Sequence, residues 1–245
     1  MKHLEFACKR FLVLVCVVMS VSLTTAQAPP APETITRAAA DDTALVADYY
    51  PAGDAAPVLI LLHMLNSRRG AYDPLIPDLQ ADGYAILNVD MRGHGDSDGS
   101  RDWDAVIADM AAWVDWLAEN ERSGDMGLAF VGGSIGANVA LISCAQSDAC
   151  RGAVALSPGL DYRGVKPEAA LVDGLAERMA LLVAAQNDAS SSTAIRQMFL
   201  NAKGDVSARI YPGRAHGTRL FDSRYQSVSR LILGWLAELF APEED

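Results

Sequence analysis

The stretch LAFVGGSIGA at residues 128–137 decides the fold, because it joins an apolar run to a Gly-x-Ser-x-Gly pattern and then to an Ala-rich helical pattern. A strand that turns abruptly into a helix forces the apex residue into a sparsely populated backbone conformation and leaves the flanking positions little room for side chains. Gly132 and Gly136 meet this demand. The pattern nominates Ser134 as a nucleophile, with ordinary glycine-rich packing as the alternative.

Outside this stretch, the chain alternates apolar runs with helical patterns. The apolar runs span 57–62, 84–89, 126–131, 153–156, 179–185 and 206–211. Strands that are apolar on both faces indicate a parallel sheet covered on both sides. Two earlier segments, 34–39 and 43–50, are separated by Asp41 and Asp42 and predict a hairpin at the sheet edge.

The clearest helical pattern spans residues 102–121, where apolar side chains recur at three- and four-residue steps and predict a stripe that faces the sheet. Further helices are expected at 68–82, 134–144, 190–200 and 223–240. Alternating strands and helices imply right-handed crossovers. The predicted fold class is therefore α/β: a doubly wound, mostly parallel eight-stranded sheet with helices on both faces.

Composition limits the possible partners. The 245 residues are 51% apolar and suffice for one core, and the formal charge of −11 argues against nucleic acid, whose phosphates require clustered Lys and Arg. The Gly132–Gly136 turn lacks the Lys-Ser/Thr of a phosphate-binding loop, and the glycines at 93–99 miss the dinucleotide spacing. We expect no cofactor and no metal.

The N-terminus has the pattern of a secretory signal peptide. Lys2, Lys9 and Arg10 precede the apolar run 11–23, which is shorter than the roughly 20 residues of a membrane-spanning helix. The expected organisation is a signal peptide at 1–26, a flexible linker at 27–33 and one domain at 34–241. The mature protein would be periplasmic or secreted, without a stable membrane span, and would keep 17 Lys and Arg against 30 Asp and Glu.

Removal of the signal peptide and export would determine which cysteines remain and whether they are oxidised. The mature chain keeps Cys144 and Cys150, which in an oxidising compartment predict a local disulfide between the end of one helix and the start of the next strand. Two buried thiols are the alternative. A zinc site is disfavoured, because no further Cys or suitably placed His completes a tetrahedron.

A serine nucleophile needs a base and an acid that orients the base. His216 is the expected base, since it lies in a glycine-rich loop after the last apolar run, whereas His63 and His94 both precede Ser134. Asp188 follows the 179–185 run directly and is the preferred acid. Its rivals are Asp161, which ends the previous strand region, and Asp205, which begins a strand at the opposite edge.

With Ser134, Asp188 and His216 in this order, the chain resembles the α/β-hydrolase family over nearly all of the mature sequence. The segment LLHML at 61–65 is similar to the family's His-Gly segment, and RGHGDS at 92–97 to its Arg-Gly-His-Gly-x-Ser turn. The resemblance implies an oxyanion hole formed by the backbone N–H of Ile135 with that of Leu65, or of Met64. Met64 stands where the family usually has Gly.

Only a short segment of sequence separates Ser157 from Met179, which leaves no room for a large cap domain. In this respect the chain resembles the compact, dienelactone-hydrolase-like branch of the family. The resemblance implies a serine hydrolase that cleaves a small-molecule carboxylic ester, thioester or lactone through an acyl-enzyme on Ser134. A peptidase or acyltransferase of the same fold and a non-catalytic binding protein are the alternatives. The sequence leaves the acyl and alcohol specificity and the oligomeric state open.

Overall fold

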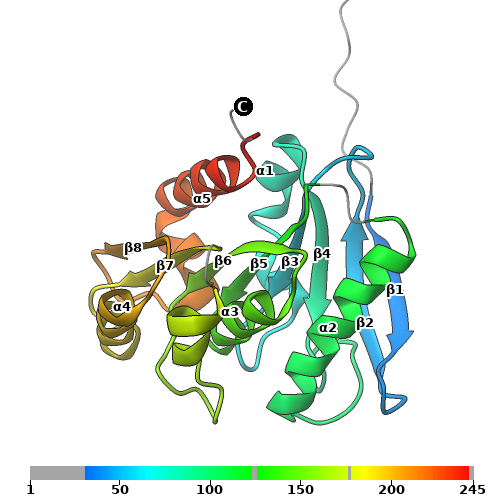
Figure 1. The fold of residues 1–245 in the computed structure, drawn as a ribbon, viewed down its shortest axis with the longest axis horizontal. Helices are drawn as coiled ribbons and strands as arrows, with labels where there is room; N and C mark the ends of the chain where they lie inside the picture. The colour runs from blue at the N-terminus through cyan, green and yellow to red at the C-terminus, as the bar shows by residue number, and fades with distance from the viewer. Residues whose placement is uncertain (1–30, 123–125, 176–177, 243–245) are drawn as a thin grey trace, which may run out of the picture.

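The computed structural model describes residues 31–122, 126–175 and 178–242, and its centre is one eight-stranded sheet (Figure 1). The sheet has the order β1-β2-β4-β3-β5-β6-β7-β8. Its strands are β1 (Glu33–Ala38), β2 (Ala44–Tyr50), β3 (Val58–Leu62), β4 (Ala85–Asp90), β5 (Leu128–Gly133), β6 (Cys150–Leu156), β7 (Met179–Ala185) and β8 (Val206–Tyr211). The predicted signal peptide at 1–26 and residues 27–30 of the predicted linker lie outside the described residues.

The pairing of the strands confirms the predicted sheet. β1 and β2 form the antiparallel hairpin at one edge, β2 pairs antiparallel with β4, and all remaining neighbours from β4 to β8 are parallel. Every residue of β3, β4 and β5 is buried, as expected for strands covered on both faces. The carboxyl ends of the parallel strands therefore share one edge, where ligands bind in open α/β sheets.

Helices cover both faces of this sheet. The helices are α1 (Ile76–Ala81), α2 (Trp103–Glu119), α3 (Ile135–Gln146), α4 (Ala189–Asn201) and α5 (Leu220–Leu239). Figure 1 shows α1 and α5 on one face, and α2, α3 and α4 on the other. Two apolar cores follow from this arrangement, and one of them includes Trp113 of α2 while the other includes Trp235 of α5.

The single helix expected at 68–82 is wrong. The chain forms a 3₁₀ turn at Arg69–Tyr72 and then the short helix α1. Pro77 suits the first turn of α1, but within a continuous helix it would remove a hydrogen bond and clash with the preceding turn. The 3₁₀ turn is also tied to the end of β4, because the Arg69 N–H donates to Asp90 at 2.7 Å and the Arg69 guanidinium forms an ion pair with the same carboxylate.

The connection between β6 and β7 is small, as expected for a fold without a large cap. Its described part contains an isolated bridge between Tyr162 and Val165 and a π-helical turn at Ala170–Gly174. Within residues 31–122, 126–175 and 178–242, no helix has the length and apolar character needed to cross a membrane.

Candidate active site

Ser134 occupies the apex of the turn between β5 and α3. Its backbone has φ 54° and ψ −120°, a strained conformation for a residue with a side chain. A Cβ on Gly132 would overlap the Gly136 carbonyl oxygen, and a Cβ on Gly136 would lie 2.5 Å from the Leu62 carbonyl oxygen. The glycines are therefore required by the close approach of strand and helix, as the sequence pattern predicts.

The structure brings the side chains of Ser134, Asp188 and His216 together at the carboxyl edge of the sheet. The Ser134 Oγ lies 2.7 Å from His216 Nε2, and His216 Nδ1 lies 2.7 Å from Asp188 Oδ2. The Asp188 side chain is 9% exposed, whereas that of His216 is 35% exposed. A hydroxyl, an imidazole and a sheltered carboxylate in this sequence of contacts can pass a proton from the hydroxyl to the ring.

The two other histidines of the described chain are engaged elsewhere. His63 is fully buried, its Nδ1 donates to the Met64 carbonyl at 2.7 Å, and its Nε2 accepts from the Met91 N–H at 3.1 Å. Burial lowers the pKa of His63 to about 4. His94 lies edge-on to His63, with ring centroids 5.0 Å apart, and burial lowers its pKa also. Both rings are therefore packed in the core rather than at the Ser134 turn.

The two rival acids also lie apart from the base. Asp161 accepts a hydrogen bond from the Gly164 N–H at 2.7 Å and forms an ion pair with Lys166 at 3.5 Å. Asp205 directly precedes β8 at the amino end of that strand, and its carbonyl oxygen accepts from the Ala180 N–H. Asp188 is the acid that contacts the imidazole.

The expected oxyanion donors lie in two segments next to the turn. Ile135 is the first residue of α3, so its N–H has no partner within the helix. Leu65 follows β3, and in the described chain its N–H donates to no backbone carbonyl. Met64 lies beside the nucleophile turn, because a Cβ on Gly133 would be 3.2 Å from Met64 Cγ. The Met64 side chain therefore packs against the turn that carries Ser134.

Ser157 is a site residue that the sequence analysis missed. It directly follows β6 with φ 56°, is fully buried, and its Oγ accepts a hydrogen bond from the Gly217 N–H at 2.9 Å. Gly217 directly follows His216, so this bond fixes the loop that carries the imidazole. Tyr162 lies edge-on to the His216 ring, with centroids 6.2 Å apart, and its hydroxyl lies 3.0 Å from Ser191 Oγ. The only signal in the sequence is the position of Ser157 at a strand end.

Three depressions surround these side chains. One has a volume of about 510 Å³ and is lined by His216, Arg214, Arg219, Arg224 and Asp222, among others. In the described part of the chain, the guanidinium groups of Arg214 and Arg219 have no hydrogen-bond or ion-pair partner. The second depression, of about 430 Å³, includes Met64, Leu65 and Phe221, and the third, of about 580 Å³, includes Leu160, Tyr162 and Thr193. Of the three depressions, only the first is lined by one of the three aligned side chains, His216.

Cys144 and Cys150 form the expected disulfide, which joins the last turn of α3 to the first residue of β6. In the described ranges, no group of three or more His, Cys, Asp or Glu side chains is placed to hold a metal ion.

Comparisons with known proteins agree with this architecture. The model of the hydrolase family "serine aminopeptidase, S33" matches residues 53–201. The fold is similar to that of the Pyrococcus furiosus esterase Pf2001, with a TM-score of 0.74, 18% identity and coverage of 86% of this chain and 91% of that one. It is also similar to a dienelactone hydrolase from Anabaena variabilis, with a TM-score of 0.69, 16% identity and coverage of 85% and 99%.

A pyrethroid hydrolase of Sphingobium wenxiniae is 26% identical over 117 residues. The alignment covers 47% of this chain and 41% of that relative, so the chain matches less than half of the relative's length. The family model, in contrast, covers more than half of the chain and contains the Ser134 turn and Asp188. The chain belongs to the serine aminopeptidase S33 family of hydrolases, and it has the α/β-hydrolase fold.

Proposed function

We propose that the protein hydrolyses carboxylic esters through an acyl-enzyme on Ser134, with His216 as general base and Asp188 as the acid that orients it. The observation that carries the proposal is the chain of two 2.7 Å contacts from Ser134 Oγ through the imidazole to Asp188 Oδ2. The same geometry in an S33-family hydrolase argues against a non-catalytic binding protein, because a strained serine without a reaction only destabilises the fold.

The proposed reaction has two steps. His216 Nε2 takes the Ser134 proton as Oγ attacks the ester carbonyl carbon, and the imidazolium then protonates the departing alcohol. Water, deprotonated by the same nitrogen, then attacks the acyl carbon; the bond from that carbon to Ser134 Oγ breaks, the imidazolium returns its proton to Oγ, and the carboxylic acid leaves. The N–H groups of Ile135 and Leu65 would hold the oxyanion in both steps, and loss of one such donor typically raises the barrier by about 3 kcal/mol.

The charged side chains near His216 favour an ester substrate over the N-terminus of a peptide. An aminopeptidase must hold an α-ammonium group close to the scissile bond, and such a group needs an anionic partner. The depression beside His216 presents Arg214, Arg219 and Arg224 against the single carboxylate of Asp222. The names of the pyrethroid hydrolase and of the Pyrococcus furiosus esterase also favour esters.

The test is a substrate panel with the mature protein and its Ser134→Ala variant. p-Nitrophenyl esters of two to twelve carbons would be compared with aminoacyl p-nitroanilides and with acyl transfer to added alcohols. We expect saturable ester hydrolysis that the variant loses by at least about 10³-fold, because the nucleophile is removed. Faster turnover of the anilides would instead support an aminopeptidase, and equal rates for both proteins would refute the role of Ser134.

We also propose that residues 1–26 direct export and are removed, which places the protein in the periplasm or outside the cell. The Cys144–Cys150 disulfide supports this proposal, since such bonds persist in oxidising compartments. The mass of the mature chain purified from its native compartment is the test. Cleavage after Ala26 is expected, and an intact N-terminus on cytoplasmic protein would contradict it.

A further inference from the structure

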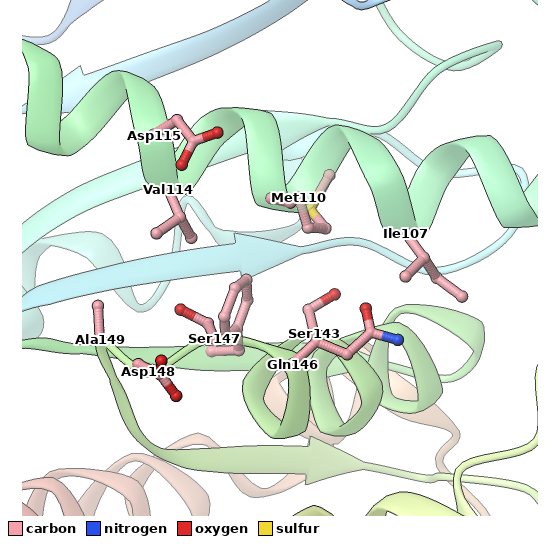
Figure 2. A pocket seen from close by; sticks show the side chains of 11 residues that line it. Ile107, Met110, Val114, Asp115, Ser143, Gln146, Ser147, Asp148 and Ala149 are labelled. Carbon is pink, nitrogen blue, oxygen red and sulfur yellow. The ribbon is translucent and has the colours of Figure 1, made fainter.

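A pocket of about 260 Å³ lies between α2 and α3, and its lining contains none of the three side chains proposed to be catalytic. Figure 2 shows α2 on one side of it and the end of α3 with the following loop on the other. The pocket therefore needs an explanation independent of the proposed function.

One side of the pocket is apolar. Ile107, Met110, Ala111 and Val114 lie on one face of α2, at helical steps of three and four residues, and Phe130 of β5 also lines the pocket. A cavity of roughly 150 Å³ with such walls can hold one benzene ring. The larger volume here suits one aromatic ring with a short substituent.

The opposite side contains a hydroxyl without a partner. Ser143 is 5% exposed, and its Oγ has no hydrogen bond within the described chain. Figure 2 shows this side chain pointing from α3 toward Met110 of α2. A buried hydroxyl without a hydrogen bond is disfavoured in the free protein, so a ligand that reaches Ser143 Oγ gains from its presence.

The polar side is also fixed in place. The disulfide closes the loop from Cys144 to Cys150, and Arg178 donates to the Ser147 and Cys150 carbonyl oxygens at 3.1 and 2.9 Å. Since the loop is held before any ligand arrives, little ordering remains to oppose binding.

Charged groups on both sides of the pocket, Asp115 on α2 and Asp148 in the loop after α3, select the sign of the ligand. Asp115 lines one end of the pocket, and its carboxylate has no partner among the described residues. Asp148 also lines it and lies 3.5 Å from Arg178. The carboxyl end of α3 at Gln146 adds the negative end of the helix dipole. Two carboxylates against the single guanidinium of Arg178 leave a net negative charge, which favours an ammonium group over an anion.

We propose that this pocket is a second binding site that takes a small organic cation, with one apolar ring against α2 and an ammonium group near Asp115 and Ser143. The inference does not depend on the proposed hydrolase activity, because binding can be measured without turnover.

The probe is 2-phenylethylammonium, compared with neutral 2-phenylethanol and anionic 3-phenylpropionate, on the mature chain carrying ¹³C-methyl methionine. The Met110 methyl reports the pocket and the Met64 methyl reports the proposed active site, with both signals assigned through Leu substitutions. We expect saturable movement of the Met110 signal with the cation, weaker movement with the alcohol, none with the carboxylate, and no change at Met64.

Two variants separate the contributions to binding. Asp115→Asn changes a surface carboxylate with little effect on folding, and should weaken binding of the cation about fivefold or more. Ala111→Phe fills the pocket and should abolish the Met110 shift. An unmoved Met110 signal would mean that the pocket holds water only and would overturn the proposal, as would a Met64 shift alone or equal binding of the carboxylate.

Discussion

The hydrogen bond from the Gly217 N–H to Ser157 Oγ gives the sharpest prediction about how the fold positions its base. Ser157→Ala removes the acceptor of a 2.9 Å bond and leaves a buried N–H without a partner. An unsatisfied buried group typically costs about 1–3 kcal/mol. Because the donor directly follows His216, part of this cost falls on the position of the imidazole relative to Ser134 Oγ.

If most of that free energy is lost from positioning, kcat/KM falls roughly 5- to 100-fold, since each 1.4 kcal/mol corresponds to a factor of ten. The assay is hydrolysis of the best p-nitrophenyl ester from the panel, with thermal unfolding measured on the same samples. Ser157→Thr keeps an acceptor oxygen and should recover part of the rate. Ser97→Ala is the matched control, because it removes another buried serine hydroxyl that accepts from a backbone N–H, that of Val46 at 2.8 Å, and does not contact the His216 loop.

A Ser157→Ala protein with unchanged kcat/KM and a lower melting temperature would refute this reasoning. The bond would then stabilise the fold without positioning the base. An equal loss of rate in Ser97→Ala would refute it as well, because the effect would then come from a general destabilisation of the fold.

Three further predictions concern the scaffold. Gly136→Ala should lower the free energy of unfolding in urea by about 3 kcal/mol, because the new Cβ would lie 2.5 Å from two carbonyl oxygens. Gly133→Ala should cost less, since its Cβ would meet its neighbours at 3.1 Å or more. Equal losses of unfolding free energy in the two variants would contradict the close approach of strand and helix at Gly136. Cys144→Ser opens the short loop closed by the disulfide and should lower the free energy of unfolding by roughly 2 kcal/mol. The melting temperature should fall, and a reductant should lower that of the wild type in the same way. An unchanged melting temperature would show that the disulfide does not stabilise the fold. Because burial holds the pKa of His63 at about 4, below its ordinary 6.5, its contribution is fully present above pH 6.5 and is lost as the pH falls toward 4, by about 3 kcal/mol in all. In His63→Asn, the free energy of unfolding measured in urea should change less with pH across this window. An unaltered pH dependence would exclude the histidine as the cause.

The sequence predicts the sheet well because its strands are apolar runs bounded by turns. The hairpin at the edge, the parallel core and the disulfide between Cys144 and Cys150 all have local signals in the chain. The approach of His216 to Ser134 could also be inferred, because residues at the carboxyl ends of parallel strands share one edge. The same rule separates Asp188 from Asp205, which lies at the amino end of β8, but not from Asp161, which follows β6 at the same edge. The structure places Asp188 2.7 Å from the imidazole.

The features that were not predicted depend on contacts between distant segments. The broken helix at 68–82 is fixed partly by the Arg69 contacts with Asp90, which no helical periodicity encodes. The role of Ser157 in holding Gly217 depends on a bond across 60 residues. The pocket beside Met110 lies between α2 and α3 next to the fully buried Phe130, and its shape depends on side-chain packing in three dimensions.

Covalent labelling tests the central claim most directly. The mature protein would be treated with a fluorophosphonate, digested, and analysed by peptide mass spectrometry beside Ser134→Ala and His216→Gln. The account predicts one adduct, on the peptide with Ser134, absent from the first variant and formed at least about 100-fold more slowly in the second. An adduct on another residue, or one formed equally fast without the imidazole, would contradict it.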